Sequence, residues 1–121
     1  MTSPQDKFNR TFQEFAADLI RVNPEDADLR MYHMGIQGLL MASPSTLHSG
    51  FYQHVAVPFG ERILVRDESF FLENDYSETD VTDVDLINKV KTMYASMSAS
   101  DKDAVCKYMR LLVLLARKIY E

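Results

Sequence analysis

The sequence predicts an all-α fold in which about five helices form a single compact domain over residues 1–121. Apolar residues recur at spacings of three and four over several long segments, and this period is typical of helices with one buried face. A capping residue followed by proline occurs three times, in SPQD, NPED and SPST. Proline is well tolerated at the first position of a helix because the N–H that it lacks would have no partner there. A chain of this length also buries enough surface to form one core.

The first helix is expected over about residues 4–22. Ser3 is its expected cap, and Asp6 lies three residues later, beside the positive end of the helix dipole. One apolar stripe has spacings of 4, 3, 4 and 3 and consists of Phe8, Phe12, Phe15, Leu19 and Val22. We expect this stripe to face the core.

The second helix is expected over about residues 24–42, after the capping residue Asn23. It is apolar on two sides, and we therefore expect it to be central in the fold. Flexible thioethers suit irregular cores or adaptable interfaces, and we expect most internal methionines in the core. They are Met31, Met34, Met41, Met93, Met97 and Met109.

A third helix is expected over about residues 44–56, capped by Ser43 and ended by the sequence VPFG. The short apolar runs ERILVRD and ESFFLE follow. Each of them fits a helical turn or a brief strand, so residues 60–76 have no single assignment from the pattern alone.

Two further helices are expected over about residues 80–97 and 101–120. Apolar residues of the first follow helical spacing and are Val81, Val84, Ile87, Val90, Tyr94 and Met97. Ser100 is the expected cap of the second, with Asp103 completing a capping box. Its expected inward residues are Val105, Tyr108, Leu112, Leu115 and Ile119. Its basic face consists of Lys107, Arg110, Arg117 and Lys118.

An acidic connecting segment, residues 67–85, lies between the third and fourth predicted helices. It holds eight carboxylates and no Lys, Arg or His, although the net charge of the whole chain is only −5. Loops that start at Asp75 or Asp80 lack the Gly and Glu that a calcium-binding EF-hand requires. We interpret the segment as a solvated loop that also caps the fourth helix, or as an acidic surface for a basic partner.

Aromatic side chains alternate with carboxylates in this segment, as they do at many interaction surfaces. The candidate partner-binding residues are Glu68, Phe70, Phe71, Glu73, Asp75, Tyr76 and Glu78. If Phe70 and Phe71 are buried, they pin the loop onto the core. If they are exposed, they are the best candidate for a binding site.

Residues suited to catalysis or metal binding follow no recognised pattern. His33, His48 and His54 lack the spacing of zinc ligands, and Cys106 lies in a helix with an apolar face. The four glycines are isolated, so the sequence has no phosphate-binding loop. We expect structural histidines, a core or boundary thiol, and no catalytic residue, metal or cofactor. A hydrolase with an unrecognised pair of carboxylates stays an alternative.

Several features predict an intracellular protein that is not secreted. The single cysteine leaves no disulfide within the chain, and the start MTSPQDKFNR has no apolar stretch of a signal peptide. The longest apolar run, LLVLLA, is far shorter than the roughly 20 residues of a membrane span. We expect no membrane span.

Three segments carry a resemblance to a known group of proteins. They are FNRTFQEFAADLIRVNPEDADLRMY, VAVPFGERILVRDESFFLENDYSE and DKDAVCKYMRLLVLLARK, within residues 8–118. Together they resemble a family of small helical proteins of uncharacterised function, encoded by large nucleocytoplasmic DNA viruses of algae and protists. The resemblance implies a place in the infected host cell, in the virion, or in both, and it supplies no catalytic residue.

These observations favour a non-enzymatic structural or protein-interaction component of a large DNA virus. Its expected partner is a protein: another viral protein, or a second copy joined through the −8 charge of residues 67–85 and the +4 charge of residues 86–121. An accessory protein of nucleic acid or chromatin, using the basic face or the acidic segment, is an alternative. It is less favoured, because nucleic-acid binders carry a broad basic excess.

Overall fold

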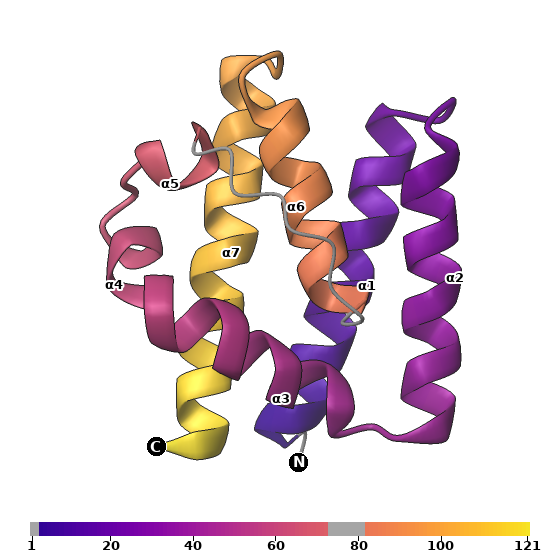
Figure 1. Ribbon diagram of the computed structural model, residues 1–121, viewed down its shortest axis with the longest axis vertical. Helices are drawn as coiled ribbons and strands as arrows, with labels where there is room; N and C mark the ends of the chain where they lie inside the picture. Colours follow the sequence, from indigo (N-terminus) through magenta and orange to yellow (C-terminus); the bar gives the residue numbers. More distant parts are fainter. Residues whose placement is uncertain (1–2, 73–81) are drawn as a thin grey trace.

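A computed structural model of the chain describes residues 3–72 and 82–121. This part of the chain consists of helices and turns with no β-strand, which confirms the predicted all-α fold (Figure 1). The α-helices are α1 (Pro4–Val22), α2 (Ala27–Ala42), α3 (Thr46–Phe51), α4 (Val57–Leu64), α5 (Ser69–Leu72), α6 (Thr82–Tyr94) and α7 (Ala99–Tyr120), and a π-helical segment, η1 (Tyr52–Ala56), joins α3 to α4. None of these helices is both long enough and apolar enough to cross a lipid bilayer.

The two longest helices, α1 and α7, pack against each other along the centre of the fold (Figure 1). They run in opposite directions, so the start of α1 and the end of α7 lie at the same end of the molecule. The predicted stripe of α1 is buried at Phe8, Phe12, Phe15 and Leu19, but Val22 is exposed at the end of the helix. Because the aromatic rings of α1 are fully enclosed, this helix supplies a large part of the core.

α3, η1 and α4 follow one another without a break, which corrects the prediction that VPFG ends the third helix. Pro58 therefore lies inside a continuous helical segment, where it has no N–H to donate to an earlier carbonyl. In the π-helical turn before it, the N–H of Val57 donates to the carbonyl of Tyr52, five residues back. The wider turn absorbs the distortion that a proline causes inside a helix.

The run ERILVRD ends α4 in a tight turn. Arg66 has a φ of 54°, in the left-handed region that glycine usually occupies. The N–H of Arg66 donates to the carbonyl of Ile63, and the N–H of Asp67 donates to the carbonyl of Arg62. These two bonds form the Schellman arrangement that closes a helix.

Three predicted caps are placed differently in the structure. Asn23 ends α1, and its side-chain N–H donates to the carbonyl of Leu19. Asp26 caps α2 because its carboxylate accepts from two backbone N–H groups. α7 is capped by Ser98 rather than Ser100, and Ser43 is separated from α3 by a turn. Several neighbouring polar residues could cap each helix, and the path of the chain before the helix decides which of them does so.

The prediction that α2 is central is wrong. Only Leu29 and Ile36 of this helix are fully buried, and α2 lies at the outer edge of the molecule (Figure 1). α1 and α6 pack against one side of it and leave the other side to solvent.

Candidate functional site

The predicted aromatic pair of the acidic segment is buried. Phe70 and Phe71 belong to α5 and are 1% and 2% exposed. The ring of Phe71 stacks on Tyr94 with centroids 4.5 Å apart, and the ring of Phe70 lies 5.2 Å from that of Phe59. Residues 67–72, which we call the α5 tether, therefore pin the chain onto α4 and α6. Their aromatic rings are not available as a surface.

The carboxylate and hydroxyl groups around the α5 tether are bonded to each other. The hydroxyl of Tyr94 donates to Glu68 at 2.6 Å, and Arg66 lies 3.9 Å from the same carboxylate. Burial and the hydrogen bond to Glu68 raise the pKa of Tyr94 above its usual value of 10.0. Glu68 thus stabilises the attachment of the tether. The other four predicted contact residues, Glu73, Asp75, Tyr76 and Glu78, lie outside the described residues.

A buried lysine of α6 packs against the α5 tether. Lys91 is 7% exposed, and its ammonium group lies 4.6 Å from the centre of the Phe70 ring. A cation over an aromatic face is favourable, and more so when both groups are removed from water. This contact was not predicted, because the helical pattern of residues 80–97 places Lys91 beside the apolar stripe without saying what lies opposite.

The basic face of α7 is divided by local ion pairs. Lys107 pairs with Asp103 at 2.9 Å, and Arg117 pairs with Glu61 at 2.7 Å. Arg117 also packs over Gly60, where an added Cβ would come within 2.9 Å of its guanidinium. Arg110 and Lys118 are exposed. The four charges therefore do not form one continuous free patch.

The three histidines are spread over different elements. His48 is buried and bonds to the hydroxyl of Tyr120 and to the side-chain oxygen of Gln5, both at 2.8 Å. Burial lowers its pKa below the usual 6.5, so it holds α1, α3 and the end of α7 together as a neutral ring. His33 is half-buried and His54 is exposed.

Cys106 is buried on α7, where its sulfur lies 3.6 Å from the hydroxyl of Tyr94. This position agrees with the predicted core thiol. Across residues 3–72 and 82–121, no group of three or more His, Cys, Asp or Glu side chains is arranged to hold a metal ion.

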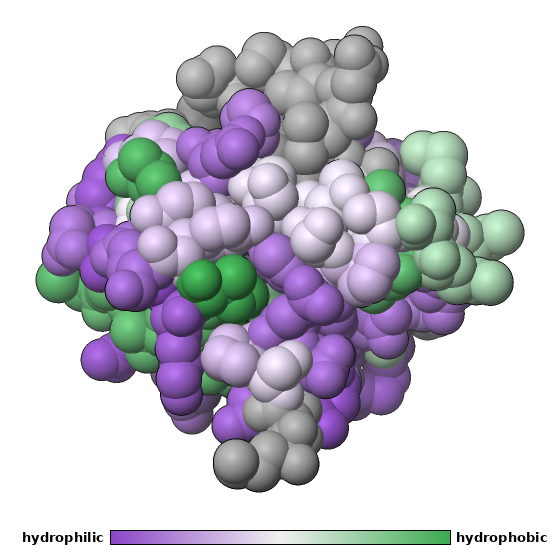
Figure 2. All heavy atoms as spheres, turned by 90° about the horizontal axis from the view of Figure 1, so that it is seen from below, coloured by the Kyte–Doolittle hydropathy of each residue, from purple (hydrophilic) through white to green (hydrophobic). Residues whose placement is uncertain are grey.

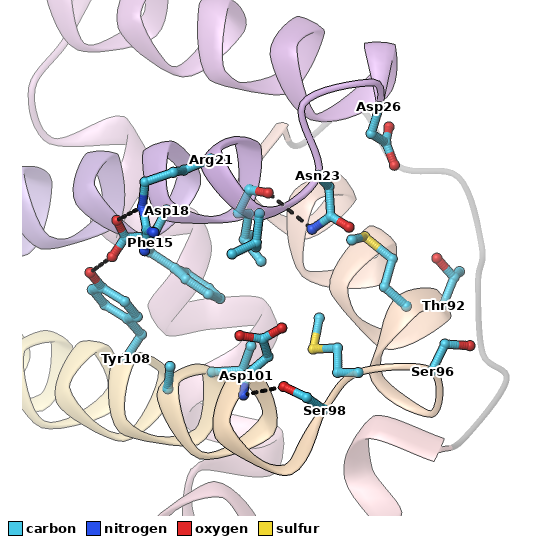
Figure 3. Close-up of a pocket in the computed structure, with 16 residues that line it drawn as sticks. Phe15, Asp18, Arg21, Asn23, Asp26, Thr92, Ser96, Ser98, Asp101 and Tyr108 are labelled. Carbon is cyan, nitrogen blue, oxygen red and sulfur yellow. Dashed lines mark hydrogen bonds and ion pairs between the residues drawn. The ribbon is translucent and has the colours of Figure 1, made fainter.

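A pocket of about 420 Å³ opens where the end of α1, the end of α6 and the start of α7 meet (Figure 3). Its apolar wall includes Phe15, Leu19, Met93, Met97 and Val105. The polar residues around it are Asp18, Arg21, Asn23, Asp26, Thr92, Ser96, Ser98, Asp101 and Tyr108. This volume lies within the range of small-molecule sites.

Most polar groups of the pocket hold the helices in place. Tyr108 donates a hydrogen bond to Asp18, and this bond together with burial raises the pKa of Tyr108 to about 12. Burial opposes ionisation of Asp26, but bonds from Lys89 and from backbone N–H groups outweigh it and lower its pKa. Asn23 and Ser98 are used as helix caps.

Asp101 is the exception among these groups. Its carboxylate points from α7 into the space between α7 and α1 (Figure 3). Within the described part of the chain it makes no side-chain hydrogen bond or ion pair. A carboxylate in the first turn of a helix is stabilised by the positive end of the helix dipole, so the position of Asp101 needs no ligand to explain it.

The outer side of α2 presents an unexpected apolar surface. Met31, Met34 and Met41 are 58%, 70% and 89% exposed, which corrects the expectation that these methionines belong to the core. Ala27 and Gly38 are exposed on the same side of the helix. We call these five residues the α2 strip. The right-hand edge of Figure 2, where α2 lies in Figure 1, carries a group of pale green atoms.

The α2 strip has no charged member. At 100° per residue its five positions fall within an arc of roughly 80°. The nearest charged residue is Arg30 on one side of the arc and Asp28 on the other, where the exposed Ala42 and Gly35 lie in between. The signal in the sequence is the apolar character of both sides of the helix, which predicts a central position. The same pattern also describes a helix with one side in the core and the other side against a partner.

Comparisons with protein-family models, with curated proteins and with solved structures found no match to this chain. The resemblance to proteins of large DNA viruses therefore stays a prediction.

Proposed function

We propose that the protein is a non-enzymatic interaction component that binds another protein chain through the α2 strip. The observation that carries this proposal is the exposure of Met31, Met34 and Met41 on one uncharged helix face. Contiguous apolar surface on a folded domain marks interaction sites, since water is displaced favourably from it. Methionine is common at such surfaces because its flexible, polarisable side chain adapts to a partner.

The inner and outer sides of α2 support the same proposal. Leu29 and Ile36 anchor the inner side in the core, so the helix is rigid and already formed before any partner binds. A preformed helix loses little conformational freedom on binding, and this favours affinity. The partner therefore meets a fixed surface.

The proposed setting is an infected host cell or a virion, inside the cell and not secreted. This part of the proposal rests on the resemblance to proteins of large DNA viruses and on the single, buried cysteine, which suits a reducing compartment. Viral proteins are accordingly the first partners to test.

Two other functions have weaker support. Nucleic-acid binding through α7 is disfavoured by the ion pairs that occupy Lys107 and Arg117. A hydrolase would use the pocket, whose lining residues include three aspartates, but two of these, Asp18 and Asp26, are engaged in holding the helices. A salt-sensitive gel shift would support the first, and turnover lost on Asp101→Asn would support the second.

Site-specific photo-crosslinking tests the proposal. A photoreactive residue at position 34 is expected to capture one defined protein in the cells that naturally produce this chain. The same residue at position 114 is expected to capture none. Leu114 is a matched control because it is an exposed apolar residue on a different helix, α7.

Substitution provides the second half of the test. With the photoreactive residue kept at position 34, the double variant Met31→Glu, Met41→Glu is expected to lose the captured partner, and Leu114→Glu is expected to keep it. If the chain without these substitutions, the double variant and Leu114→Glu all capture the partner equally, the α2 strip is not the binding surface.

A further inference from the structure

The α2 strip has a pattern of large and small residues that is complementary to itself. Met31, Met34 and Met41 project from the helix, whereas Gly38 leaves a recess. A Cβ added at Gly38 would meet no atom within 4 Å, so the recess is open to solvent. The surface therefore offers both a projection and a place to receive one.

We propose that the partner of the α2 strip is a second copy of this chain. The two α2 helices pack antiparallel about a two-fold axis that passes between them at the level of residue 36. This inference rests on the proposed function and names the occupant of that surface. In this register Met34 of each copy lies against Gly38 of the other, and Met31 lies against Met41. A two-fold interface uses the same patch on both chains, as such a pairing requires.

The charges beside the strip fit the same register. Arg30 of one copy, whose guanidinium also donates to the carbonyl of its own Pro24, lies at the same level along the pair as position 42 of the other, the last residue of α2. The last turn of α2 has no basic residue of its own, and the C-terminal end of a helix carries a partial negative charge. Each copy thus supplies a cation to the other. The two arginines are displaced by twelve residues, about 18 Å along the pair, so they do not repel each other strongly.

The size of the contact sets its expected strength. α2 has 16 residues and spans about 24 Å. A contact made mainly by one helix lies at the low end of specific interfaces, so the dimer is expected to be reversible and to depend on concentration. Close approach at Gly38 brings the two helices near enough for their side chains to interdigitate.

Sedimentation equilibrium of the full chain from roughly 10 µM to 1 mM tests the inference over the range expected for a weak interface. The weight-average mass is expected to rise from 13.9 kDa toward twice that value. Gly38→Met fills the recess that receives Met34 and is expected to raise the dissociation constant about tenfold or more. Leu114→Glu, on α7, is expected to leave it unchanged.

A size swap tests the register itself. Met34→Ala removes the projection and weakens the dimer. Met34→Ala combined with Gly38→Met exchanges the large and small positions, and the dissociation constant is expected to return toward that of the unmodified chain. Neither position packs in the core, and a thermal melt followed by circular dichroism checks that each variant is folded.

Three results would overturn the inference. They are a monomer over the whole concentration range, a dimer that tolerates Gly38→Met, and a swap that fails to restore binding. If the chain is monomeric but position 34 still captures a different protein, the proposed function stands and only the second copy is wrong. If position 34 captures nothing and the chain is monomeric, both proposals fail.

Discussion

The α5 tether and the α2 strip show opposite relations between local sequence and burial. The tether is the first part of the acidic segment 67–85, yet Phe70 and Phe71 are fully enclosed. The strip belongs to one of the most apolar helices of the chain, yet its methionines are exposed. Burial is therefore decided by what lies opposite a residue, not by the character of its neighbours in sequence. Rings that stack on a neighbouring helix are held in the core even when charges flank them.

The largest expected effect comes from breaking the tether at its centre. Phe71→Ala removes a ring that is 2% exposed and stacked on Tyr94, and it leaves a cavity. The expected loss is about 3 to 5 kcal/mol in the free energy of unfolding, measured by urea denaturation. Leu72→Ala, at an exposed position of α5, is the control and should change little. A small effect of Phe71→Ala would mean that the tether does not contribute to the core.

The bond between Tyr94 and Glu68 is the next target. Tyr94→Phe keeps the stacked ring and removes the hydroxyl, and it is expected to cost about 1 to 2 kcal/mol. Tyr52→Phe removes a hydroxyl bond to Glu121 at the surface and should have a smaller effect.

Alkaline pH provides a second measurement of the same bond. Because the pKa of Tyr94 is raised in the folded protein, the unfolded chain loses this proton first as the pH rises above 10. Stability should fall with rising pH, and part of this fall should disappear in Tyr94→Phe. An unchanged pH profile would contradict the role that we assign to the hydroxyl.

The turn that leads into the tether allows a smaller, purely backbone test. Arg66→Gly and Arg66→Ala both remove the guanidinium, so their difference reports the backbone at φ 54° and not the ion pairs of Arg66. The glycine variant is expected to be more stable by about 1 kcal/mol. Equal stability in thermal or urea unfolding would show that the turn relaxes at no cost.

The smallest effect on stability is expected in the α2 strip. Met34→Ala removes a side chain that is 70% exposed, so the free energy of unfolding should change by no more than about 0.5 kcal/mol. A loss comparable to that of Phe71→Ala would mean that Met34 packs in the core of the single chain, and the contrast between the two regions would disappear.

Much of the fold could be predicted from the period of the apolar residues. The bounds of α1 match the expected residues 4–22, and α7 starts only two residues before its prediction. The alternation of α3, η1 and α4 could not be predicted in the same way. Proline and glycine in VPFG normally end a helix, whereas here the π-helical turn η1 lets the helix continue through them.

The candidate sites were less predictable than the helices. The charge of the acidic segment predicts a binding surface. In the structure, Glu68 and the two phenylalanines instead attach α5 to the core. The strip on α2 was present in the sequence as three methionines at helical spacing. Nothing in that spacing states whether a second helix of the same chain covers them, because both sides of α2 are apolar.

The sequence by itself determined that the chain is helical, where its longest helices lie, and that α1 supplies a row of aromatic residues to the core. These properties depend on local spacing and on caps within a few residues. Only the tertiary structure decided that α2 lies at the edge, that α5 is a tether, and that Lys91 is buried against Phe70. Contacts between distant segments decide which of two apolar faces is covered, and a period along one helix carries no record of them.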